Sequence, residues 1–147
     1  MIKDIQIQND LKKLDETEKY WLNNIEEEEK QEKEITEIVD NVTAAIMLNG
    51  KTRAIVNETQ YAIASKVITA PTTYRDENGD IKECEGRQVV LVISNIALFN
   101  LAGNKYTPSI VRSDYDERYN AKANIRAAVE GWVRHITGTI KPENLDN

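Results

Sequence analysis

The side chains best suited to chemistry lie in one segment, residues 104–126. It holds three of the six tyrosines and five lysines and arginines, beside acidic residues: Lys105, Tyr106, Arg112, Asp114, Tyr115, Asp116, Arg118, Tyr119, Lys122 and Arg126. Arginine can bind a phosphate through two parallel hydrogen bonds, and the ring of tyrosine can stack on a base or another ring. The segment therefore favours a site for a nucleotide-like ligand, built from Tyr106, Arg112, Tyr115 and Arg118.

The same segment allows two other interpretations. Its arginines can pair locally with Asp114, Asp116 and Glu117 while its tyrosines line a core or a subunit interface, or the cluster can contact another protein. Duplex nucleic acid is a poor candidate, because a pI near 4.9 opposes the phosphate contacts that dominate such binding.

Two motif-like stretches fail on spacing. Gly50-Lys51-Thr52 ends like a phosphate-binding P-loop, but Ala45 stands where that motif needs a glycine. Asp76, Asn78 and Asp80 resemble the start of a calcium loop, but no glutamate occupies its closing position. A hairpin turn explains these three residues better.

Cysteine and histidine are equally uninformative about catalysis. A single cysteine, Cys84, excludes an intramolecular disulfide, and with a single histidine it leaves too few soft ligands for structural zinc. His135 falls in the last turn of a predicted helix, where it can satisfy free carbonyls. We therefore expect no catalytic residue, metal or cofactor, a protein that is not an enzyme, and a reducing, cytoplasmic setting. No signal sequence and no membrane-spanning apolar run is recognisable.

The charge of the chain is concentrated in its first third. Residues 1–50 carry six Lys and Arg against thirteen Asp and Glu, a net −7, whereas residues 51–147 carry a net +1. Apolar residues recur at helical spacing before and after a run, 26–34, that has none. The pattern predicts a helical arm over 1–50 that ends at Asn49-Gly50, as one helix or as two.

The spacing of apolar residues changes after residue 50, and the rest of the chain is predicted to form a core domain over 51–147. Residues 52–56 resemble a strand, and 57–67 fit either a short helix capped at Asn57 or a strand. Residues 72–84 predict a hairpin with a type I′ turn at Asn78-Gly79. The β-branched run 89–93 predicts a central strand buried on both faces. Residues 96–101 and 106–111 are expected to be connecting or edge pieces.

A C-terminal helix is expected to close the domain. Ser113 and Asp116 resemble a capping pair for it, and five apolar residues at steps of three and four face the sheet: Ala121, Ile125, Val129, Trp132 and Ile136. A mostly basic ridge runs beside them, through Arg118, Lys122, Arg126, Glu130 and Arg134. Gly138 and Pro142 are expected to end the helix.

These elements predict an α+β fold: a long N-terminal helical arm, a small, mostly antiparallel β core, and a C-terminal helix packed on the sheet. The apolar surface of the helical arm is larger than so small a sheet can bury, so we expect a homo-oligomer formed through the N-terminal helices.

This organisation resembles that of the phage Thoeris anti-defence sponge proteins, in the helical start ending at Gly50, the β core around 89–93 and the closing helix. The resemblance implies an oligomer that sequesters a cyclic ADP-ribose-type signal with aromatic, asparagine and arginine side chains. Asn95, Phe99 and Arg112 are the counterparts it suggests. Together with the first cluster, these give six candidate ligand-binding residues: Asn95, Phe99, Tyr106, Arg112, Tyr115 and Arg118.

Three functions of different class remain open. The first is a non-enzymatic oligomer that binds a phosphorylated, nucleotide-type small molecule to block host defence. The second is an acidic inhibitor or adaptor whose 26–37 segment docks on a basic surface of a host protein. The third is a purely structural assembly protein.

Overall fold

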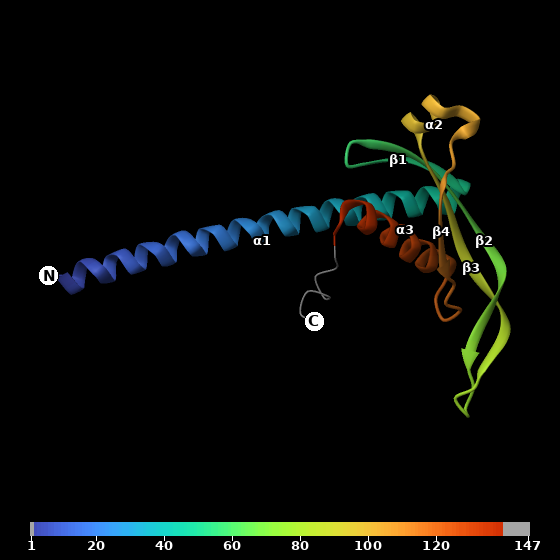
Figure 1. The fold of residues 1–147 in the computed structure, drawn as a ribbon, viewed down its shortest axis with the longest axis horizontal. Helices are drawn as coiled ribbons and strands as arrows, with labels where there is room; N and C mark the ends of the chain where they lie inside the picture. The colour runs from blue at the N-terminus through green and yellow to red at the C-terminus, as the bar shows by residue number, and fades with distance from the viewer. Residues whose placement is uncertain (1, 140–147) are drawn as a thin grey trace. The chain divides into compact units, whose positions relative to one another are not determined.

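The computed structural model describes the backbone of residues 2–139 and the side chains from residue 15 onward. Figure 1 shows the order of elements, and the predicted α+β fold is confirmed. Four strands form one antiparallel sheet in the order β1-β2-β3-β4, and the C-terminal helix packs on β3 and β4. By internal contacts the chain divides into residues 1–34 and residues 35–147. The prediction placed this boundary at residue 50.

The N-terminal arm is one helix, α1 (Ile2–Asn49), so the single-helix alternative is correct. It ends as predicted at Gly50, whose φ of 76° is the left-handed conformation that glycine adopts without steric cost. In the second unit its last turns bury residues at steps of four, three and four: Ile35, Val39, Val42 and Ile46. These turns belong to the core of the sheet domain, and this is why the compact unit begins at Ile35.

Strands β1 (Lys51–Val56) and β2 (Thr59–Arg75) form a hairpin, so the strand alternative for residues 57–67 is correct. Its two-residue loop is Asn57-Glu58, and both residues have positive φ, 50° and 63°. Two positive φ values are what a type I′ turn requires, and asparagine tolerates them better than most residues do. The predicted helix cap at Asn57 is therefore wrong, because the asparagine serves a hairpin.

Strand β3 (Ile81–Asn95) pairs with β2 along its whole length, which confirms the predicted hairpin at residues 72–84. The turn itself differs from the prediction, because only Gly79 has a positive φ. Asp76 holds the turn instead: its Oδ1 accepts hydrogen bonds from the backbone N–H groups of Asn78 and Asp80, both at 2.9 Å.

Residues 89–93 lie in the centre of the sheet, but the prediction that they are buried on both faces is wrong. Val89, Leu91 and Ile93 are buried, whereas Val90 is half-buried and Val92 is exposed. Alternate side chains of a strand point to opposite faces, so one face of the sheet is covered and the other is not. We call the second one the open face.

Helix α2 (Ile96–Ala102), a short 3-10 turn (Gly103–Lys105) and strand β4 (Ser109–Asp114) follow. Helix α3 (Ala121–Thr137) begins after Asn120, whose side chain accepts a hydrogen bond from the N–H of Ala123. The predicted capping pair is wrong, because Ser113 still belongs to β4. The predicted helix end at Gly138 is confirmed; Pro142 lies outside the described residues.

The core lies between the covered face of the sheet and two helical segments, the last turns of α1 and helix α3. Helix α3 contributes Ile125, Ala128, Val129, Trp132 and Val133, so three of the five predicted core positions are buried. Trp132 packs edge to face on Tyr61 of β2, with ring centroids 5.2 Å apart. Within residues 2–139, no helix has the length and apolarity to cross a membrane.

Candidate anion-binding face of the sheet

The open face has a simple side-chain pattern that follows from the register of the strands. Lys51, Ala64, Val92 and Ile110 form one row across the four strands, and Arg53, Ala62 and Ser94 form the row beside it. A third row contains Lys66, Val90 and Arg112, and the next contains Ile68, Gln88 and Asp114. The face is therefore apolar in its middle, with cations on both sides and one acid, Asp114, beyond Arg112.

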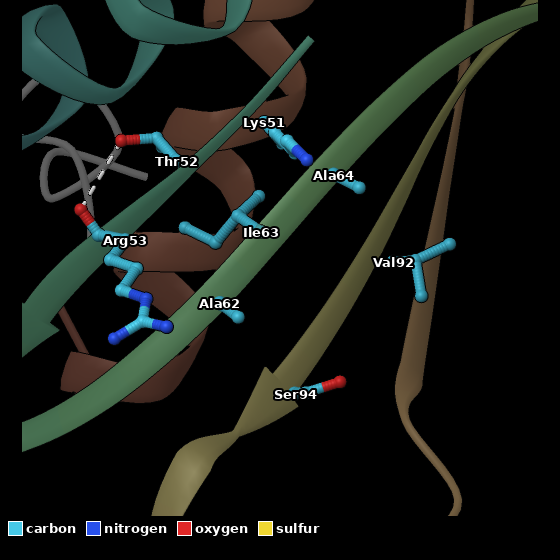
Figure 2. Close-up of a pocket in the computed structure, with 8 residues that line it drawn as sticks. All are labelled: Lys51, Thr52, Arg53, Ala62, Ile63, Ala64, Val92 and Ser94. Atoms are coloured by element: carbon cyan, nitrogen blue, oxygen red, sulfur yellow. Dashed lines mark hydrogen bonds between the residues drawn. The ribbon is translucent and has the colours of Figure 1, made fainter.

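A hollow of about 480 Å³ lies over the first two rows. Figure 2 shows it on three neighbouring strands, with eight lining residues: Lys51, Thr52, Arg53, Ala62, Ile63, Ala64, Val92 and Ser94. The side chains of Ala62, Ala64 and Ser94 are small, whereas the neighbouring strand β1 carries the two long cations. The hollow thus arises from a difference in side-chain size on adjacent strands.

The cations of the open face are free of acidic partners. Among residues with described side chains, neither Lys51, Arg53, Lys66 nor Arg112 forms an ion pair. All four are exposed. Lys51 and Arg53 are two positions apart on one strand, so their side chains leave the same face about 7 Å from each other. This spacing can hold two negatively charged groups of one ligand.

The structure distributes the six candidates from the sequence over three places. Asn95, Phe99 and Tyr106 lie around α2: the N–H of Asn95 donates to the Tyr106 hydroxyl at 2.7 Å, and Phe99 packs edge to face on Tyr106. The Asn95 side chain caps α2 by accepting from the N–H of Leu98. Arg112 lies on the open face, on β4.

Tyr115 and Arg118 lie beyond the other end of β4, in a loop of residues 115–120 that we call the β4–α3 corner. Tyr106 precedes β4 and Tyr115 follows it, so the strand's six residues, roughly 20 Å, separate the two groups. The guanidinium of Arg87 lies 4.0 Å from the centre of the Tyr115 ring and donates to both carboxylate oxygens of Glu117.

Ion pairs neutralise the arginines of the corner. Arg118 donates to both oxygens of Asp116, with its Nη2 2.8 Å from Oδ2. The Arg118 side chain, and then its backbone N–H, lower the pKa of Asp116 to about 2. The hydrogen bond from Arg87 lowers the pKa of Glu117 in the same way. The corner matches the alternative in which local acids satisfy the arginines.

Asn124, which the sequence analysis missed, organises the corner. It is buried in the first turn of α3, and its Oδ1 accepts from the N–H of Asp116 at 2.7 Å. Its Nδ2 lies within hydrogen-bonding distance of three carbonyls, those of Asp116, Tyr119 and Asn120. An asparagine inside an otherwise apolar helical stripe was the available signal, because a buried amide must find partners.

The arginines of the predicted basic ridge are also neutralised. Arg118 precedes α3, Arg126 pairs with Asp40 of α1 at 2.9 Å, and Arg134 pairs with Glu130. Lys122 is exposed and forms no ion pair with a described side chain. Among the described residues, no group of His, Cys, Asp and Glu side chains has the arrangement of a metal site.

No protein-family model, curated protein or solved structure matches this chain. The open face, with its free cations, is the strongest candidate for a functional site.

Proposed function

We propose that this protein is a non-enzymatic, homo-oligomeric binding protein of the cytoplasm that holds a phosphorylated, nucleotide-type small molecule on its open face. Sequestration of such a signal, to block host defence, is the role implied by the resemblance to the anti-defence sponges. The observation that carries the proposal is a pair of cations, Lys51 and Arg53, that form no ion pair with any described side chain and stand at the edge of a hollow with a floor of small side chains.

Phosphate chemistry fits this pair. The guanidinium of Arg53 can donate two parallel hydrogen bonds to one phosphate, and the ammonium of Lys51 can act as a point charge on a second. The Ser94 hydroxyl adds a neutral donor on the far side of the hollow. Ala62 and Ala64 let a flat ring approach the sheet, and Val92 gives that ring an apolar contact.

Binding without turnover fits the lining of the hollow. Its eight residues include no carboxylate, histidine or cysteine, so no carboxylate or imidazole base among them can activate the Thr52 or Ser94 hydroxyl. The same residues supply charge, shape and an apolar contact, which are the requirements of recognition.

Isothermal titration calorimetry with pyrophosphate, ADP and cyclic ADP-ribose, and with adenosine as the uncharged control, tests the proposal. We expect the phosphorylated probes to bind and adenosine not to. The double variant Lys51→Gln, Arg53→Gln should lose about 100-fold in affinity, because each charged hydrogen bond contributes about 1.5 kcal/mol or more.

The matched control is the double variant Arg87→Gln, Arg118→Gln, which removes two positive charges from the β4–α3 corner instead. It should bind like the wild type. Loss of binding in the control, or retained binding in the first variant, contradicts the proposed site. Mass spectrometry of the recovered probes should return them unchanged, and conversion to a product contradicts the non-enzymatic part of the proposal.

A further inference from the structure

The first unit of the chain carries exposed apolar side chains. In α1, Trp21, Leu22 and Ile25 are 59%, 57% and 47% exposed. Successive residues of a helix are 100° apart, so these three share one side with Glu18, Glu28 and Glu29. We call these six residues the Trp21 face; all are exposed. It is an apolar centre with acidic groups at both ends.

The open face over β3 and β4 is apolar in its centre and basic at one border. Val92 and Ile110 lie opposite each other, 37% and 55% exposed, and half-buried Val90 lies beside them. The next row carries Arg112 of β4 and, on the neighbouring strand β2, Lys66, neither of which has an ion-pair partner among the described side chains. Asp114 follows two residues after Arg112 on the same face, so the basic border is this one row.

The dimensions of the two surfaces agree. A helix is about 10 Å wide and strands are about 4.8 Å apart, so one helix covers two strands. The Trp21 face extends over residues 18–29, roughly 17 Å at 1.5 Å per residue, which is close to the length of the six-residue strand β4. A helix on β3 and β4 leaves the cations of β1 accessible and covers the β3 side of the hollow at Val92.

We propose that the Trp21 face of α1 docks on the β3–β4 half of the open face of a second copy of this chain. Each copy carries both surfaces, so a twofold pair makes the contact twice and leaves neither surface exposed. The contact places Glu28 and Glu29, at one end of the Trp21 face, against Lys66 and Arg112, and it buries Trp21 and Ile25 on Val92 and Ile110. Val92 also lines the hollow of the proposed ligand site, so the two proposals share this side chain, and the contact is tested without ligand. The proposal specifies the oligomer contact as helix on sheet.

A charge-swap experiment tests it without ligand. One variant has a basic helix (Glu18, Glu28 and Glu29→Lys), and the other has an acidic sheet (Lys66→Glu and Arg112→Glu). Each alone faces like charges across the contact, so we expect its dimer dissociation constant in sedimentation velocity to rise tenfold or more. Mixed together, they should form a heterodimer, because both contacts of the pair then join opposite charges.

Two matched controls separate this contact from a general effect of charge. Glu16, Glu27 and Glu34→Lys makes the charge change of the helix variant on the opposite side of α1. Lys105→Glu with Lys122→Glu makes the charge change of the sheet variant at exposed lysines away from the open face. Both controls should remain dimeric. Circular dichroism should show that every variant keeps its helix content, since all substituted residues are exposed.

Fluorescence gives a second readout. The chain has two tryptophans, exposed Trp21 and buried Trp132. Dilution of the wild type below its dissociation constant should shift the emission to longer wavelength, and Trp21→Phe should abolish that shift. A wild-type monomer at high concentration overturns the proposal. So does a sheet variant that stays dimeric while the helix variant does not, or a mixture that fails to assemble.

Discussion

The open face and the β4–α3 corner both display arginine beside small or aromatic side chains, and the difference between them is the position of the carboxylates. In the corner, Arg87 pairs with Glu117 and Arg118 with Asp116. On the open face, Lys51 and Arg53 lie across from Ala64 and Ala62, with no acid among the residues that line the hollow. An arginine that is already paired with a carboxylate of its own chain attracts an anionic ligand less strongly.

This comparison shows why local composition directed the sequence analysis to the corner. The corner is rich in charged and aromatic residues over a few positions, and its charges are satisfied within those positions or by Arg87. The open face draws single residues from four strands, so its cations are scattered over residues 51–112. Charged residues that are close in the sequence tend to pair with one another. Residues that come from separate strands are brought together only by the folded sheet.

The largest effect we expect comes from Asn124→Ala, which tests whether the corner is structural. The change leaves an N–H and up to three carbonyls without their buried partner, so the free energy of unfolding should fall by about 3 kcal/mol. Urea denaturation measures the loss. Ligand affinity, measured well below the melting temperature, should stay unchanged, and a parallel loss of affinity contradicts the separation of the two regions.

A smaller effect should follow when a carboxylate is built into the open face, making it resemble the corner. Ala64 is the cross-strand partner of Lys51, so Ala64→Glu places an acid beside that cation. Ala64→Gln adds nearly the same volume without charge and serves as the control. We expect affinity for ADP to be about tenfold weaker in the Glu variant than in the Gln variant. Equal affinities would show that charge at Lys51 does not matter.

Much of the fold followed from periodicity in the sequence. The stripe in α1 and the β-branched run at 89–93 predict their elements because burial selects apolar residues at the spacing of each structure. The stop signals at Gly50 and Gly138 were equally clear, since both residues adopt positive φ at a helix end.

The errors arose where one residue type serves two structures. Asn57 suits both a helix cap and a type I′ turn, and only the pairing of β1 with β2 decides between them. Val90 and Val92 match a strand buried on both faces, yet the helices cover one face alone. The proposed open-face site was not predicted, because it depends on the register that brings Lys51 beside Ala64, and the turn that fixes this register was interpreted as a helix cap.

The smallest effect concerns the acidity of Asp116, which reports how completely the corner neutralises itself. Its pKa of about 2 lies below the ordinary value of 3.8, chiefly because of the Arg118 hydrogen bond. A depressed folded-state pKa contributes stability that is present above the unfolded value and is lost as the pH falls from about 4 through about 2. NMR titration of the Asp116 carboxyl should return the low value, and Arg118→Gln should raise it toward 3.8. On this exposed surface the change in stability should be slight, since solvent screens the pair. An Asp116 that titrates near 3.8 in the wild type would mean that Arg118 is free in solution, and the corner would then have a cation available for a ligand, as the open face does.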